Sequence, residues 1–160
     1  MKLPFLVHWT VYGITTRSTT AEIGAALWND KPEYTITYLP EYLVGTTLLR
    51  SDYDVDKTII SISADVDSHI YVGLAGDETD WDSDASIDFR AGGLNDVLAA
   101  EGWTLKYGWH VDWFDGTEMK PLVTVWATTI KAGGMVTFEA TKNNLMSAIF
   151  ASEGTNFINH

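Results

Sequence analysis

The chain has 160 residues, of which 46% are hydrophobic and 20% charged. This composition predicts a single folded domain over residues 1–160 rather than a disordered tail. Acidic residues outnumber basic ones 22 to 10, giving a formal charge of −12, which argues against nucleic acids and anionic membranes as partners. The chain has no cysteine, which excludes disulfides and thiolate sites, and no long apolar run, so membrane insertion is not expected.

Alternating apolar and polar residues predict short β-strands along the chain. The first such segment places Phe5, Val7, Trp9 and Val11 on one face. Further strands are predicted, in chain order, at residues 34–39, 60–66, 70–74, 123–130 and 135–140. Because the segments are short and turn residues separate them, we expect an all-β fold, an antiparallel β-sandwich or jelly roll.

Two segments carry signals of short helices instead. Residues 20–28 read TAEIGAALW and offer Thr20 as an N-cap. Residues 94–101 read LNDVLAAE and are followed by Gly102, a residue that often ends a helix. One or two short helices are therefore expected beside the strands.

Acidic residues gather in one window, since residues 52–88 hold 11 of the 22 acids. The window contains two D-x-D-x-D segments, Asp52-Asp54-Asp56 and Asp80-Asp82-Asp84, and Asp88 follows the second. Alternate carboxylates in a loop can converge on Ca²⁺, a hard cation that prefers oxygen ligands. The sequence therefore predicts a calcium site at Asp80, Asp82, Asp84 and Asp88, although neither segment has the glycine and glutamate of an EF-hand. The alternative is a solvated acidic surface that favours solubility.

Residues 103–115, WTLKYGWHVDWFD, form the most aromatic stretch of the chain. Alternation places one apolar set on a single face: Trp103, Leu105, Tyr107, Trp109, Val111 and Trp113. Such a face is typical of a core strand, so Trp103 and Trp109 are predicted to be buried, whereas Trp113 lies near the strand end and could reach the surface. Phe114 and Tyr71 fall on polar faces and are better candidates for exposure. If aromatic rings stack on a ligand, the predicted residues are Trp81, Trp113 and Phe114, because no core pattern explains Trp81.

No catalytic motif is evident. His110 and Asp112 share the polar face of a strand, but two residues alone do not make a zinc site, which needs three or four ligands. Nucleophile elbows, P-loops, dinucleotide-binding glycines and H-E-x-x-H segments do not occur. A non-catalytic protein is therefore expected.

Scattered core and turn positions between residues 39 and 141 resemble the accessory β-sandwich modules of secreted bacterial polysaccharide-degrading enzymes. The matching positions are Pro40, Leu43, Gly45, Leu49-Arg50, Asp67, Tyr71-Val72 and Gly102-Trp103. Where such modules usually have proline-tryptophan-leucine, this chain has Asn95-Asp96-Val97-Leu98. The resemblance implies a non-catalytic, carbohydrate-associated sandwich, and it assigns no ligand residue.

Two functional hypotheses follow. The first is a β-sandwich module that binds carbohydrate or mediates adhesion, with a glycan as its partner. The second is a structural subunit, such as a phage virion decoration protein or filament protomer, that contacts copies of itself or other assembly subunits through its N-terminal strand. No signal peptide is visible in the first residues, and an extracellular or virion-surface location is expected in either case.

Overall fold

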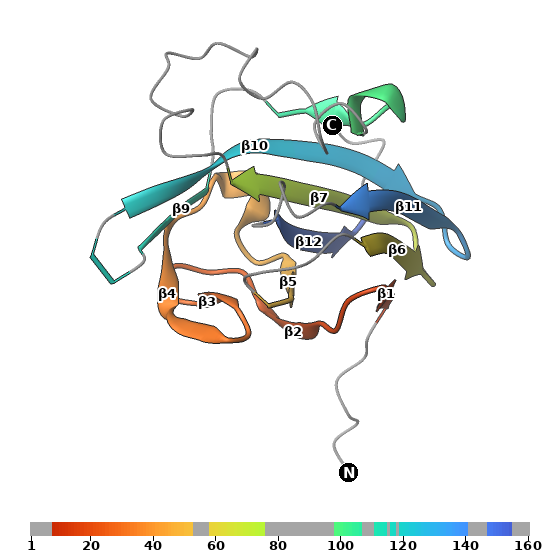
Figure 1. The fold of residues 1–160 in the computed structure, drawn as a ribbon. Helices are drawn as coiled ribbons and strands as arrows, with labels where there is room; N and C mark the ends of the chain where they lie inside the picture. The colour runs from red at the N-terminus through yellow and green to blue at the C-terminus, as the bar shows by residue number, and fades with distance from the viewer. Residues whose placement is uncertain are drawn as a thin grey trace.

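Antiparallel strands in two sheets make up most of the chain, as Figure 1 shows for this computed structural model. The structure describes residues 8–52, 58–75, 98–106, 111–114, 116–117, 119–140 and 147–154. The expected all-β antiparallel sandwich is confirmed, and strands lie where the alternation predicted them around residues 34–39, 60–66, 70–74, 123–130 and 135–140. Within the described ranges, no helix has the length and apolar character needed to cross a membrane.

The smaller sheet has three strands, in the order β1 (Trp9–Tyr12), β6 (Thr58–Ala64) and β11 (Met135–Ala140). Successive residues of a strand point to opposite faces, and β6 follows this rule closely. Ile60, Ile62 and Ala64 are buried, whereas Ile59 is 61% exposed. One face of this sheet is therefore core, and the other faces solvent.

The larger sheet contains the remaining strands. Its order is β2 (Arg17–Thr20), β5 (Thr47–Arg50), β12 (Ser147–Glu153), β7 (Ser68–Ala75), β10 (Met119–Ile130), β9 (Val111–Phe114), β4 (Lys31–Tyr38) and β3 (Ala26–Trp28), with β8 (Thr104–Leu105) also paired to β10. A single 3₁₀ turn, η1 (Glu41–Leu43), connects β4 to β5. The sheet curves so that its two ends approach each other: the backbone N–H of Asn29 after β3 donates to the carbonyl of Ser51 after β5 at 2.9 Å.

The larger sheet buries apolar side chains on both faces, which produces two cores. We call the cluster between the two sheets the intersheet core; it contains Trp9, Leu49, Ile60, Ile62, Ala64, Ile70, Val72, Leu98, Trp103, Trp126, Ile130, Phe138, Ile149 and Ala151. We call the cluster inside the curve the concave core; it contains Ala21, Leu27, Trp28, Ile36, Leu39, Leu43, Leu48, Val111, Trp113, Ala148 and Phe150. Adjacent residues such as Leu48 and Leu49 thus enter different cores, which explains why their segment shows no simple alternation.

The alternation predicted that the aromatic stretch after residue 102 has a single apolar face. In the structure its side chains enter two different cores. The pairing of β10 with β7 shifts register between Leu122 and Thr124. A shift of one residue exchanges the two faces of a strand. Accordingly, Leu105 of β8 packs against the intersheet core, whereas Val111 of β9 lies in the concave core. The prediction of a single apolar face over residues 103–113 is therefore wrong.

Two of the tryptophans in that stretch were expected in the core. Trp103 is 6% exposed, and its ring meets that of Phe138 edge-on at 5.8 Å between centroids, so this prediction is confirmed. Trp109 lies outside the described residues.

One predicted helix is wrong and the described part of the other is confirmed. Residues 20–28 form a turn followed by β3, in which Ala26 lies opposite Thr35 of β4. Gly24 has φ +93° and its N–H donates to the carbonyl of Ile36, so the segment is held by the sheet rather than by helical bonds. Residues 98–100 are helical, and Gly102 ends that turn with φ +90°.

The described part of the predicted N-terminal strand completes the chain's own small sheet. Trp9 lies opposite Ala64 and Tyr12 opposite Ser61 in the antiparallel pairing of β1 with β6. Trp9 is 7% exposed. Phe5 and Val7 lie outside the described residues.

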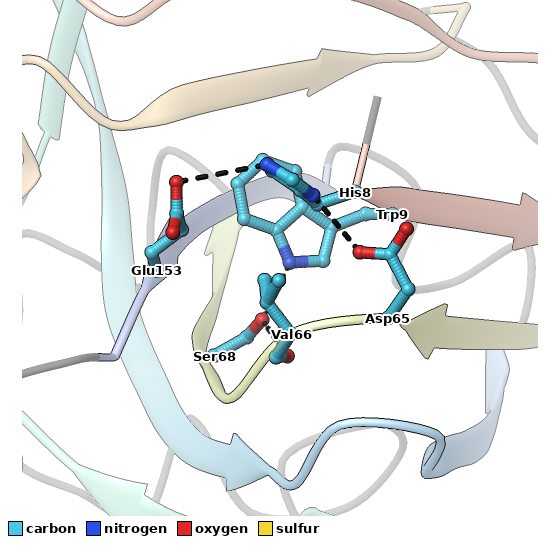
Figure 2. A network of polar contacts seen from close by, with 6 residues as sticks. All are labelled: His8, Trp9, Asp65, Val66, Ser68 and Glu153. Carbon is cyan, nitrogen blue, oxygen red and sulfur yellow. Dashed lines mark hydrogen bonds and ion pairs between the residues drawn. The ribbon is translucent and has the colours of Figure 1, made fainter. Parts of the chain in front are cut away.

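A polar network holds β1 against the turn between β6 and β7 and the end of β12 (Figure 2). The Trp9 indole N–H donates to Ser68 Oγ at 2.7 Å, and the Ser68 hydroxyl donates to the carbonyl of Val66 at 2.8 Å. His8 also contacts two carboxylates: its Nδ1 lies 2.9 Å from Asp65 Oδ1, and its Nε2 lies 3.6 Å from Glu153 Oε2. Ser68 is fully buried, so its hydroxyl satisfies an indole that water cannot reach.

Replacing Ser68 with alanine is expected to lower the free energy of unfolding by about 1–3 kcal/mol, since a buried N–H loses its acceptor. Ser61→Ala is the matched control, because its bond to Thr137 is exposed, and it should cost less than about 0.5 kcal/mol. Chemical denaturation measures both. If the Ser68→Ala loss is the same in a Trp9→Phe background, the indole contact does not explain it.

Candidate functional site

A groove lies on the face of the larger sheet that points away from the smaller sheet. It has a volume of about 620 Å³ and is lined by Tyr42, His69, Tyr71, Gly102, Thr104, Lys106, Ala127, Thr128 and Thr129. This volume is within the usual range for small-ligand sites. The groove is therefore the candidate binding site of the described part of the chain.

Strand register explains why these side chains meet. Tyr71 of β7 and Thr104 of β8 both lie opposite Ala127 of β10, one on each side of it. Alternation sends the intervening Ile70 and Val72 into the intersheet core. The small side chain of Ala127 thus forms a floor between two taller neighbours, which creates a hollow along β10.

Aromatic rings form one wall of the groove. The Tyr42 ring, carried by η1, has its centroid 5.4 Å from that of Tyr71, with the planes tilted by 45°. The Tyr71 ring stacks on the imidazole of His69, with 6.3 Å between centroids and 20° between planes. Both tyrosines are half-buried and pack against the concave core, so the wall is held in place by the fold.

A cation stands beside this wall. The backbone N–H of Lys106 donates to the carbonyl of Val125 at 2.8 Å, which fixes the residue after β8 against β10. Its ammonium nitrogen lies 5.0 Å from the centroid of the Tyr42 ring, a cation–π contact. In the part of the chain that the structure describes, no aspartate or glutamate lines the groove.

The two tyrosine hydroxyls stay protonated at neutral pH. Burial raises the pKa of Tyr42 to about 12, and the neighbouring Tyr71 and Tyr38 add to the increase because like charges oppose ionisation. Burial also raises the pKa of Tyr71. Both hydroxyls are therefore neutral, and that of Tyr42 is itself buried without a hydrogen-bond partner among the described residues.

Two of the three ligand-stacking residues predicted from the sequence, Trp113 and Phe114, lie among the described residues, and they do not form one surface. Trp113 is 1% exposed and meets Trp28 edge-on, with 4.8 Å between ring centroids. A ring enclosed in the concave core offers no face to a ligand, so the expectation that Trp113 reaches the surface is wrong. Phe114 is half-buried and, as its neighbour in β9, lies on the opposite face of that strand.

The predicted calcium ligands and one predicted stacking residue lie outside the described residues: Asp80, Asp82, Asp84, Asp88 and Trp81. They stay predictions. Among the residues that the structure does describe, no group of three or more acidic or histidine side chains is placed to hold a metal ion. Asp52, from the other acidic segment, is exposed.

The sequence indicated one member of the groove and missed the others. Tyr71 could be found because it alternates with the core residues Ile70 and Val72. Tyr42 and Lys106 carry no such signal, since one belongs to a 3₁₀ turn and the other follows a strand of two residues. Only the pairing of β7, β10 and β8 brings the groove's residues together.

Comparisons with known proteins show which solved structures have a similar fold. No protein-family profile and no curated protein matches the chain. Two solved structures do. A beta-glucuronidase from glycoside hydrolase family 2 matches 96% of this chain with a TM-score of 0.57 and 14% identity. A GH138 enzyme targeting pectin rhamnogalacturonan II matches 97% of it with a TM-score of 0.52 and 16% identity.

The chain spans only a small part of each enzyme, 14% of the first and 17% of the second. At this level of identity the likeness concerns architecture alone. The described β-sandwich therefore has the fold of a minor portion of two much longer glycoside hydrolases.

Proposed function

We propose that the chain is a non-catalytic module that binds carbohydrate in the groove beside Tyr42 and Tyr71. The observation that carries this proposal is the combination of a tyrosine wall with a small floor at Ala127. Sugar rings present apolar C–H faces that pack on aromatic rings, and their hydroxyls bond to neutral donor and acceptor groups. The hydroxyl of Tyr71 and the threonines of the groove supply such groups.

Two further observations support a carbohydrate ligand. The fold is similar to small parts of a beta-glucuronidase and of a GH138 enzyme targeting pectin. The positions between residues 39 and 141 resemble accessory modules of polysaccharide-degrading enzymes, and several of them have the structural role expected of such positions. Leu43 and Leu49 are buried, and Gly45 has φ +83°.

Binding fits the groove better than hydrolysis does. Most glycoside hydrolases place two carboxyl groups on either side of the scissile bond, one as acid and one as base or nucleophile. Where the structure describes the lining of this groove, it includes no carboxyl group. The described side chains of the groove thus favour contacts with a sugar over its cleavage.

The alternative hypothesis, an assembly subunit that exchanges its N-terminal strand, lacks comparable support. The described residues of that strand pair with β6 of the same chain, and Trp9 is buried there. The binding module is therefore the better supported of the two hypotheses.

A glycan array followed by affinity measurements on the best ligand tests the proposal. Tyr71→Ala is expected to weaken binding at least about tenfold, equivalent to roughly 1.4 kcal/mol, because it removes the central ring of the wall. Tyr12→Ala is the matched control, since Tyr12 is 53% exposed on the other sheet, and it should bind as the wild type does.

Two results would count against this assignment. One is the absence of binding to every glycan on the array. The other is full binding by Tyr71→Ala. If Tyr71→Ala does not fold, Ala127→Leu fills the floor without removing a packed ring, and full binding by that variant would contradict the site equally.

A further inference from the structure

The charge of the groove differs from that of the chain as a whole. Acidic residues outnumber basic ones more than two to one in the sequence. Among the described residues that line it, the groove nevertheless contains the cation of Lys106 and no acidic side chain, and Glu101, exposed next to Gly102, is not one of them. A local excess of positive charge in an acidic protein indicates a ligand that carries negative charge.

The ammonium group of Lys106 is positioned for such a ligand. Its backbone bond to Val125 and its contact with the Tyr42 ring hold it at the groove wall. Among the described residues, no carboxylate lies within ion-pair distance of it. An aromatic ring attracts the cation without neutralising it, so the positive charge is still available to an anion.

The surrounding groups suit a carboxylate on a sugar ring. The exposed hydroxyl of Thr104 can donate to a carboxylate oxygen, and Tyr71 presents a ring beside it. A carboxylate paired with an ammonium and neutral donors forms charge-assisted hydrogen bonds, which are stronger than those of a neutral hydroxyl. A sugar with a ring face and a carboxyl group would use both parts of the groove.

We propose that the groove selects acidic sugars, namely uronate residues of a polysaccharide, with the carboxylate paired to Lys106 and the sugar ring against Tyr71. This inference rests on the proposed carbohydrate-binding function and adds the chemical class of the ligand. Because the chain as a whole is acidic, an anionic polymer is repelled elsewhere on the surface, and selection depends on this local cation.

Polygalacturonate and its fully methyl-esterified form provide a matched pair of probes, since they share a backbone and differ in charge. The wild-type chain is expected to bind the acid form at least about tenfold more tightly than the ester in calorimetric titrations. Lys106→Gln should reduce that preference to less than about threefold. Lys131→Gln is the control, because Lys131 is exposed beyond β10, and it should keep the full preference.

The outcomes separate this inference from the proposed function. Equal affinity for the two forms, or a preference that survives Lys106→Gln, would overturn the selection for acidic sugars while leaving carbohydrate binding in place. Binding to neutral glycans combined with no binding to either polygalacturonate or alginate would have the same meaning. Failure to bind any glycan, acidic or neutral, would overturn both.

Discussion

Replacing Trp113 with alanine is expected to lower the free energy of unfolding by about 3–5 kcal/mol, as large-to-small changes of buried aromatic residues do. The indole is 1% exposed and meets two other rings, Trp28 at 4.8 Å and Tyr34 at 5.3 Å between centroids. Removing it takes away apolar burial and leaves a cavity that its rigid neighbours cannot fill. Urea denaturation followed by circular dichroism measures the loss.

Trp113→Phe is the control, because it keeps an aromatic ring in the concave core and should cost less than half as much. The experiment also distinguishes a core residue from a ligand contact. A surface ring used for stacking would lose ligand affinity on truncation with a stability change of less than about 0.5 kcal/mol. That result would return Trp113 to the binding site and contradict its burial.

Replacing Gly13 with alanine is expected to destabilise the fold by more than about 3 kcal/mol. Gly13 follows β1 and has φ +100°, a backbone conformation that is strained for any residue with a side chain. A Cβ there would also overlap the carbonyl oxygen of Ile59, which is backbone and cannot rotate away. The end of β1 would have to move off β6, which disturbs the strand that carries Trp9 into the intersheet core.

Gly24→Ala separates the two contributions, since Gly24 has φ +93° but no atom lies within 4 Å of its added Cβ. It should cost about 1–2 kcal/mol, the strain of the backbone conformation alone. Thermal unfolding of both variants provides the comparison. Equal losses would show that the contact with Ile59 relaxes at no cost, contrary to our expectation.

The strands could be predicted from the sequence where one face of a sheet is buried and the other is not. In β6, the buried Ile60 and Ile62 alternate with polar neighbours, and the prediction is confirmed. The signal fails where both faces are buried, because Leu48 and Leu49 serve different cores. Local pattern also misassigned residues 20–28, where pairing with β4 outweighs helix propensity.

The candidate site could be predicted only in part, for a different reason. A shift in pairing register between Leu122 and Thr124 exchanges the two faces of the strand. No residue type in the sequence indicates this shift. Simple alternation assigned Trp113 to the same face as Trp103, because it takes no account of a shift in the partner strand β10. Tyr42 and Lys106 reach the groove through the order of strands in the sheet, which is a property of topology rather than of local sequence.

The contact between His8 and Glu153 shows that the first and last described segments of the chain lie close together. Their side-chain atoms are 3.6 Å apart, and the N–H of Gly154 donates to the carbonyl of Asp67 at 2.7 Å, next to the same turn. The segment before β1 and the segment after β12 thus lie next to each other, on opposite sides of the β6–β7 turn. A circularly permuted polypeptide would have a short linker between these two points and new termini in the turn at residues 132–134. Because that turn joins β10 and β11, which lie in different sheets, the permuted chain would retain the strand pairs of the described residues. The same geometry suits the fold to insertion as a compact unit within a single surface loop of a larger host.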